Sequence, residues 1–137
     1  MREIKFRTIT SRNYEDKVKI YQVEMINFVD NQICLKSFES GNCVGFEKLT
    51  DCKLLQFTGF KDKNEVEIYE GDIVKYVNKL YTVEFFNGGF FLKCLSELNS
   101  DNSELVYGVH FSDDSNIENF CEIVGNIYEN KDILKGA

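Results

Sequence analysis

The sequence predicts a mainly β protein of the β-rich α+β class, with one or two short helices. Its 137 residues include 12 Phe and 7 Tyr but no Pro, and aromatic and β-branched side chains favour strands. Short alternations of apolar and polar residues recur between turns rich in Asn, Asp and Gly. The length suits one compact unit built from two parts, which we place at residues 1–53 and 54–137.

The first part is predicted to consist of short strands joined by polar turns. Ile4 and Phe6 alternate with Lys5 and Arg7, as in a half-buried strand. The stretch "VKIYQVEMINF" suits one bent strand or two, and a short strand around residues 33–36 lies between the turn-like "VDNQI" and "ESGN". The stretch "FEKLTDCKLL" fits either a short helix or a strand.

The centre of the chain, "YTVEFFNGGFFLK", carries a strong hairpin signal. Asn87 and Gly88 both accept the positive φ of a type I′ turn. With these two residues in the loop, three cross-strand pairs follow: Val83 with Leu92, Glu84 with Phe91, and Phe85 with Phe90. We therefore predict that Val83 and Phe85 are core residues.

A second turn at Asn78-Lys79 would extend this hairpin into a three-stranded meander. The predicted strands cover residues 73–77, 80–86 and 89–93. The new pairs are Val74 with Val83 and Tyr76 with Tyr81. The apolar residues of all three strands then share one face, which a slip of one residue would destroy.

The last part of the chain alternates between strand and helix signals. "VYGVHF" is typical of a strand, and "SDDSNIENF" suits a short helix capped by Ser112. "EIVGNIY" is predicted to be a strand, in which Gly125 indicates a bulge or close packing. Asn130 is placed to cap a last helical turn at residues 131–135.

Five cysteines are present, at positions 34, 43, 52, 94 and 121, and no two are spaced as C-x-x-C. We expect buried, reduced thiols. A zinc site would need thiolates gathered from distant segments, since the spacing matches no metal motif. We therefore predict no cofactor and no metal.

Net charge disfavours nucleic acid as a partner. The net charge is −7, and all of it comes from residues 94–137. This segment has nine acidic residues and only two basic ones, Lys131 and Lys135. Such a segment repels phosphate. No apolar run approaches the roughly 20 residues of a membrane span, and "MREIKFR" lacks the apolar core of a secretory signal. We expect a cytoplasmic protein with no membrane partner.

Two segments resemble a known family. "LLQFTGFKDKNEVEIYEGDIVKY" and "EIVGNIYENKDIL", with "MREIKFR" at the start, resemble the YopX family of bacteriophage and prophage proteins, which is largely uncharacterised. The resemblance implies a small phage or prophage protein of the bacterial cytoplasm, with an SH3-like, partly open β-barrel in its C-terminal part packed with an N-terminal β subdomain. It implies no activity. The family usually has Asn-Gly where this chain has Asn64-Glu65, and Glu accepts a positive φ poorly.

The residues of these segments are interpreted as architecture. The structural signature consists of Gly59, Asp62, Tyr69, Gly71, Asp72, Gly125 and Asn126. Gly71 supplies a backbone conformation that other residues resist, and Asp72 can accept backbone N–H groups at the turn. The alternative is a divalent cation held by Asp62, Glu67, Glu70 and Asp72, but their spacing fits no EF-hand loop.

The predicted function is that of a non-catalytic accessory protein that acts through self-assembly or contacts with a host or phage protein. Nucleotide-binding and hydrolase motifs are absent from the sequence. The alternative is a nucleic-acid-binding β-barrel module that uses Lys61, Lys63, Lys75 and Lys79. Opposite charges at the two ends of the sequence indicate a homo-oligomer. The candidate interface residues are Arg2, Arg7 and Phe91, and Phe91 is expected on the outer face of the hairpin.

Overall fold

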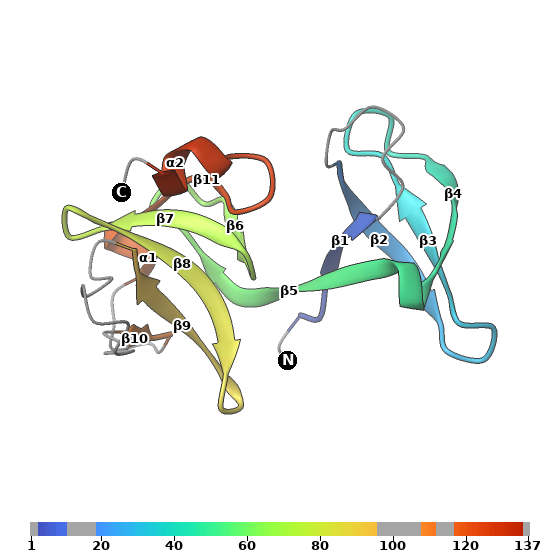
Figure 1. Cartoon of the computed structure of the whole chain (residues 1–137), viewed down its shortest axis with the longest axis horizontal. Helices are drawn as coiled ribbons and strands as arrows, with labels where there is room; N and C mark the ends of the chain where they lie inside the picture. Colours follow the sequence, from blue (N-terminus) through green and yellow to red (C-terminus); the bar gives the residue numbers. More distant parts are fainter. Residues whose placement is uncertain (1–2, 11–18, 96–107, 112–116, 136–137) are drawn as a thin grey trace. The chain divides into compact units, whose positions relative to one another are not determined.

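The computed structural model describes residues 3–10, 19–95, 108–111 and 117–135. It confirms the mainly β class, because the chain forms two antiparallel sheets and two short α-helices (Figure 1). Neither sheet closes into a barrel among these residues. Contacts divide the chain into two compact units, Met1–Phe57 and Thr58–Ala137.

The first unit is built from antiparallel strands. They are β1 (Phe6–Thr10), β2 (Ile20–Asn27), β3 (Gln32–Lys36), β4 (Cys43–Lys48) and β5 (Cys52–Lys61), with a 3-10 turn at Leu49–Asp51. These strands pair in the order β4-β3-β2-β1-β5, so β4 is an edge strand. Strand β5 continues past Phe57 into the second unit, where it pairs with β6 (Glu67–Tyr69). The ambiguous "FEKLTDCKLL" is therefore two strands separated by one tight turn.

The core of the first unit uses β3 and β5. Ile33 and Leu35 on β3 and Leu55 and Phe57 on β5 are buried. Thr8 is also buried, and its hydroxyl donates to the backbone oxygen of Lys53 over 3.1 Å. This bond satisfies the one polar group of that side chain, as burial requires.

The second unit holds the other sheet and both helices. Its elements after β5 are β6 (Glu67–Tyr69), β7 (Asp72–Tyr76), β8 (Lys79–Phe86), β9 (Gly89–Cys94), β10 (Gly108–His110), α1 (Ile117–Phe120), β11 (Cys121–Asn126) and α2 (Lys131–Lys135). The sheet has the order β10-β9-β8-β7-β11. Its core cluster comprises Ile68, Val74, Val83, Leu92, Ile117 and Cys121.

The β8–β9 hairpin has the predicted register. Val83 pairs with Leu92, Glu84 with Phe91 and Phe85 with Phe90. Asn87 and Gly88 both adopt positive φ, at 50° and 79°. Val83 is buried as predicted, but Phe85 is 51% exposed, so its assignment to the core is wrong. Phe85 lies near the hairpin end, where the centre of its ring lies 5.1 Å from that of Phe90 in an edge-on contact.

The β7–β8 turn differs from the prediction by one position. It lies at Val77-Asn78, where both residues have positive φ, at 48° and 63°. Val74 therefore pairs with Tyr81 instead of Val83. A β-branched residue rarely adopts this conformation, which is why the sequence favoured Asn78-Lys79. The resulting shift in pairing is two residues, so the side chains keep their face of the sheet.

The two helices cover only part of the predicted helical segments. Helix α1 begins at Ile117, and Ser112, which was expected to cap it, lies outside the described residues. At α2, the side-chain oxygen of Asn130 accepts the backbone N–H of Asn126 over 3.1 Å. Within the described residues, no helix has the length and apolar character needed to cross a membrane.

Candidate functional site

Asp62 organises the turn that precedes β6. Its carboxylate is buried, with Oδ1 accepting the N–H groups of Asn64 and Val66 over 2.8 and 2.9 Å. Its Oδ2 accepts the N–H of Ile123 on β11 over 3.1 Å. A carboxylate that accepts three backbone N–H groups needs no cation for charge compensation. Asp62 therefore closes its own turn and fixes that turn to a distant strand.

Glu65 adopts the conformation that its residue type resists. Its φ is 65°, and its N–H donates to the backbone oxygen of Asp62 over 3.0 Å. The turn thus keeps a left-handed position although the residue there is Glu. Its backbone bonds, together with those to the Asp62 side chain, hold this geometry.

The two segments of the structural signature meet in the second unit. The N–H of Ile127 donates to the backbone oxygen of Gly71 over 2.9 Å. Gly71 has a φ of 88°, and a Cβ there would lie 2.8 Å from the Tyr128 ring. Asp72 Oδ2 accepts the N–H of Tyr69 over 2.8 Å, and Asn126 Oδ1 accepts that of Tyr128 over 3.0 Å.

Gly125 and Gly59 complete this signature. The β7–β11 pairing shifts between Ile123 and Gly125, and a Cβ on Gly125 would lie 2.7 Å from the Asn130 side-chain oxygen. Gly59 has a φ of 90°. Both glycines therefore serve backbone geometry.

Cys121 lies beside these acidic residues and is a poor nucleophile. Burial, and after it the charges of Asp62 and Asp72, together raise the pKa of its thiol from 9.0 to about 12. The thiolate is the reactive form of cysteine. This thiol therefore stays protonated and packs as a core side chain.

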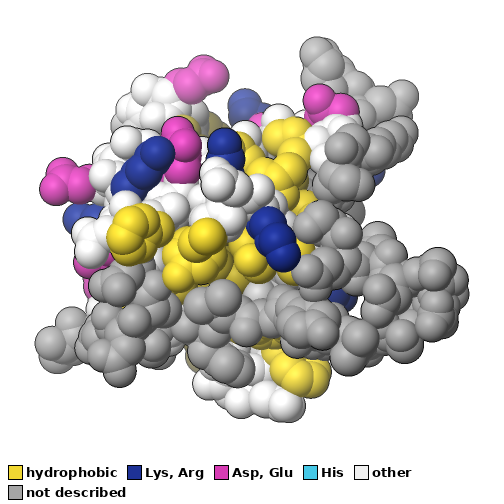
Figure 2. Space-filling view, turned by 90° about the vertical axis from the view of Figure 1, so that its left-hand side faces the viewer, with side chains coloured by type: hydrophobic (Ala, Val, Ile, Leu, Met, Phe, Trp, Pro, Cys, Tyr) yellow, Lys and Arg dark blue, Asp and Glu magenta, His cyan; other side chains and the backbone are white. Residues whose placement is uncertain are grey.

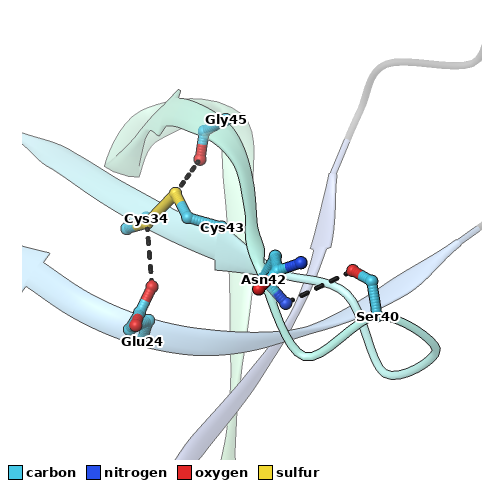
Figure 3. The surroundings of a disulfide bond; sticks show 6 residues. All are labelled: Glu24, Cys34, Ser40, Asn42, Cys43 and Gly45. Atoms are coloured by element: carbon cyan, nitrogen blue, oxygen red, sulfur yellow. Dashed lines mark hydrogen bonds between the residues drawn. A yellow bond between two sulfur atoms is a disulfide. The ribbon is translucent and has the colours of Figure 1, made fainter.

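One group of potential metal ligands is found among the described residues, and it lies elsewhere. Glu24, Cys34 and Cys43 bring a carboxylate oxygen and two sulfurs within 4.8 Å of one another. They come from β2, β3 and β4 of the first unit, and Figure 3 shows the Glu24 side chain directed toward Cys34. Oε2 of Glu24 lies 3.4 Å from Sγ of Cys34.

Cys34 and Cys43 are joined by a disulfide, whereas the sequence led us to expect reduced thiols. Their Cα atoms are 6.5 Å apart, a separation that a disulfide spans. Cys34 is 4% exposed, but Cys43 lies at the surface on the edge strand. Cys52, Cys94 and Cys121 take no part in a disulfide.

Two β-bulges bring these three residues together. In the β2–β3 pairing the register shifts between Val23 and Met25, so Glu24 and Met25 both lie opposite Cys34. In the β3–β4 pairing the register shifts so that Cys43 lies opposite Lys36. Without this second shift Cys43 would face the opposite side of the sheet, because neighbouring residues alternate. Bulges commonly redirect side chains beside functional sites.

This cluster was not predicted, because β-bulges leave no clear pattern in the amino-acid sequence. The available signal was the "ESGN" turn, which has one cysteine on each side of it. A hairpin at that turn already brings positions 34 and 43 onto neighbouring strands. It does not determine which face Cys43 occupies.

A second candidate lies in the second unit, as an open groove of about 500 Å³. Its lining comprises Lys63, Lys75, Tyr76, Val77, Asn78, Phe120 and Glu122. Val77 and Phe120 are 67% and 60% exposed, and Lys63 pairs with Glu122 over 3.3 Å. Figure 2 views the molecule from the side of the β7–β8 turn and shows hydrophobic side chains beside basic and acidic ones.

The candidate interface residues are not assembled as predicted. Phe91 is 4% exposed, so its expected place on an outer face is wrong. Side chains on both faces of β9 are buried. The centre of the Phe91 ring lies 5.8 Å from that of Phe86, in an edge-on contact. Arg7 is half-buried with its guanidinium 5.3 Å from the Phe38 ring centre, and Arg2 lies outside the described residues.

Comparisons with known proteins support the same fold. The model of the YopX protein family matches residues 5–135. The crystal structure of protein EF1440 from Enterococcus faecalis is similar with a TM-score of 0.61, at 23% identity, over 98% of this chain and 99% of that one. Likeness at this identity concerns the fold alone. The comparison with curated proteins gives no match.

Proposed function

Because the chain belongs to the YopX protein family, we propose that it is a non-catalytic accessory protein of phage or prophage origin. It acts in the bacterial cytoplasm through contacts with other protein chains, and its first partner is a second copy of itself. The observation that carries this proposal is the groove beside the β7–β8 turn, where Val77 and Phe120 expose apolar surface.

The groove has the composition of a protein-binding surface. Exposed apolar side chains that gather in one place mark interaction sites, whereas scattered ones are ordinary. Here Val77, Phe120 and Tyr76 line the groove together with the polar side chains of Lys75 and Asn78. An apolar centre with a polar rim is the usual anatomy of protein interfaces.

Charge favours self-association as the first case to test. Residues 1–20 carry six basic and three acidic side chains, whereas residues 94–137 carry nine acidic and two basic ones. Opposite charges on two copies steer their encounter. The acidic residues of one copy complement Lys75 at the groove of another.

Light scattering coupled to size exclusion tests this proposal at low and high salt, with protein in the tens of micromolar. The wild type should be an oligomer, and a Val77→Asp/Phe120→Asp variant should be a monomer. The matched control, Phe28→Asp/Val29→Asp, changes side chains that are 75% and 92% exposed in the first unit and should keep the oligomer. A wild-type monomer at both salt concentrations would contradict self-association.

A nucleic-acid-binding function is the alternative, and one observation favours it. Lys63 and Lys75 line the same groove as Tyr76 and Phe120, and single strands bind where lysines flank aromatic side chains. Titration with labelled single- and double-stranded DNA at two salt concentrations distinguishes the two functions. Tight binding that weakens steeply with salt would favour nucleic acid over protein.

A further inference from the structure

The cluster of Glu24, Cys34 and Cys43 contains more than a disulfide requires. Two cysteines on neighbouring strands are sufficient for the bond between Cys34 and Cys43. The bulge in β2 adds a carboxylate from a third strand, with its oxygen 3.4 Å from the sulfur of Cys34. In the reduced protein, this arrangement would place a carboxylate beside two thiols.

Electrostatics disfavour the thiolate form of this group without a cation. A carboxylate opposes the ionisation of a neighbouring thiol, because like charges repel at short range. A divalent cation removes that repulsion and binds all three groups. Two thiolates and one carboxylate are ligands that zinc accepts, with a fourth position left for water.

The distance between the carboxylate and the Cys34 sulfur also suits a tetrahedral ion. Ligands bound at about 2.0–2.3 Å around tetrahedral zinc lie about 3.5–3.8 Å from one another. The separation of 3.4 Å between Glu24 Oε2 and Cys34 Sγ is close to that value, and all three ligand atoms lie within 4.8 Å. Cys34 is buried, whereas Glu24 and Cys43 face solvent, so an ion can enter from the surface.

We propose that Glu24, Cys34 and Cys43 form a redox-gated site for one zinc-like divalent cation. A thiol reductant donates two electrons, the S–S bond breaks, two protons are taken up and two thiols form. The cation then binds both sulfurs as thiolates with the Glu24 carboxylate, and two protons are released. In the reverse direction a disulfide oxidant accepts two electrons from the two thiolates and leaves as two thiolates of its own. The S–S bond between Cys34 and Cys43 forms again, and the cation is released because the sulfurs lose the charge that binds it.

Titration of the full chain with Zn²⁺, before and after reduction with a phosphine, tests the site. The reduced protein should bind one Zn²⁺ tightly, and the oxidised protein should not. Co²⁺ in place of Zn²⁺ should give a thiolate-to-metal charge-transfer band and the visible bands of tetrahedral Co²⁺. Equal binding by both redox forms, or a Co²⁺ complex without the charge-transfer band, would overturn the proposal.

Variants assign the ligands one by one. Cys43→Ser should abolish binding, and Glu24→Gln should weaken it roughly tenfold or more, the loss expected for even an outer partner of a metal ligand. Cys52→Ser is the matched control, since it removes a first-unit thiol that belongs neither to the disulfide nor to the cluster, and it should bind as the wild type does. Unchanged Zn²⁺ binding by Glu24→Gln would show that the Glu24 carboxylate is not a ligand of the ion.

Alkylation of the reduced wild-type protein tests the site without any substitution. Zn²⁺ should protect Cys34 and Cys43 from iodoacetamide while leaving the reactivity of Cys52 unchanged, as read by mass spectrometry of peptides. Protection of no cysteine, or of Cys52 and Cys94 instead, would place the ion elsewhere and contradict the assignment. The groove plays no part in this test, so its outcome is independent of the proposed protein-binding function.

Discussion

At the scale of single residues, the buried side chain of Asp62 stabilises the second unit through its hydrogen bonds. Its side chain accepts three backbone N–H groups, from Asn64, Val66 and Ile123. Replacement by Asn turns one acceptor into a donor and removes the charge that strengthens these bonds. We expect Asp62→Asn to lower the free energy of unfolding by about 3 kcal/mol, as measured by urea denaturation. Asp51→Asn, at an exposed position, should have little effect, and equal effects of the two would contradict this role.

Glu65 offers the opposite test, because its backbone has a φ of 65°. Gly adopts this conformation without a steric penalty, whereas other residues do not. Glu65→Gly should therefore raise the free energy of unfolding by about 1 kcal/mol. Glu65→Ala should give no such gain, since Ala keeps the Cβ. A Gly variant less stable than the wild type would show that the Glu65 side chain matters.

The buried thiol of Cys121 should make the free energy of unfolding depend on pH in the alkaline range. The pKa of its thiol is raised in the folded state to about 12, from 9.0, by burial and then by Asp62 and Asp72. A raised folded pKa gives a stabilising contribution that is complete below pH 9 and is lost as pH rises toward 12. The stability advantage of the wild type over Cys121→Ala should therefore shrink across this window. Urea denaturation at a series of pH values measures this stability difference. A difference that stays constant with pH would show that the Cys121 thiol does not cause the pH dependence.

At the scale of elements, the β8–β9 hairpin separates a core position from an exposed one. Val83 is 1% exposed, whereas Phe85, two residues further along the same face, is 51% exposed. Val83→Ala should lower the free energy of unfolding by about 2–3 kcal/mol, and Phe85→Ala by about 1 kcal/mol through its contact with Phe90. Thermal and urea unfolding compare the two variants, and a larger loss for Phe85→Ala would reverse this ranking.

The same elements show what the sequence could and could not predict. Asn87-Gly88 determined the β8–β9 register, because that pair strongly favours one turn type. Val77-Asn78 could not be predicted, since the surrounding sheet imposes positive φ on a Val that resists it. The cluster around Cys34 was missed for a related reason: its bulges depend on how three strands pair, which is not visible in any one strand.

At the scale of the whole molecule, the second unit carries a complete core of its own. All six residues of the core cluster lie between Ile68 and Cys121. The Thr58 hydroxyl donates to the backbone oxygen of Ile68 over 2.8 Å, so the unit includes the end of β5. A fragment of residues 58–137 should therefore unfold cooperatively when followed by circular dichroism.

A shorter fragment provides the control for this prediction. Residues 63–137 lack both Thr58 and Asp62, and with them the bonds to Ile68 and to β11. This fragment should show no cooperative transition. A fragment of residues 58–137 that also unfolds without cooperativity would mean that the second unit depends on residues 1–57.

The bond between Asp62 and Ile123 also sets the order in which the newly synthesised chain can mature. Sixty-one positions separate the two residues. At the roughly 5–20 residues per second of translation, a ribosome needs about 3–12 s to add them. The first unit can form during that interval, but β7 has no β11 beside it and the Asp62 carboxylate lacks one of its partners. For those seconds the nascent second unit exposes the unpaired edge of β7. A chaperone that covers this edge would act during that interval.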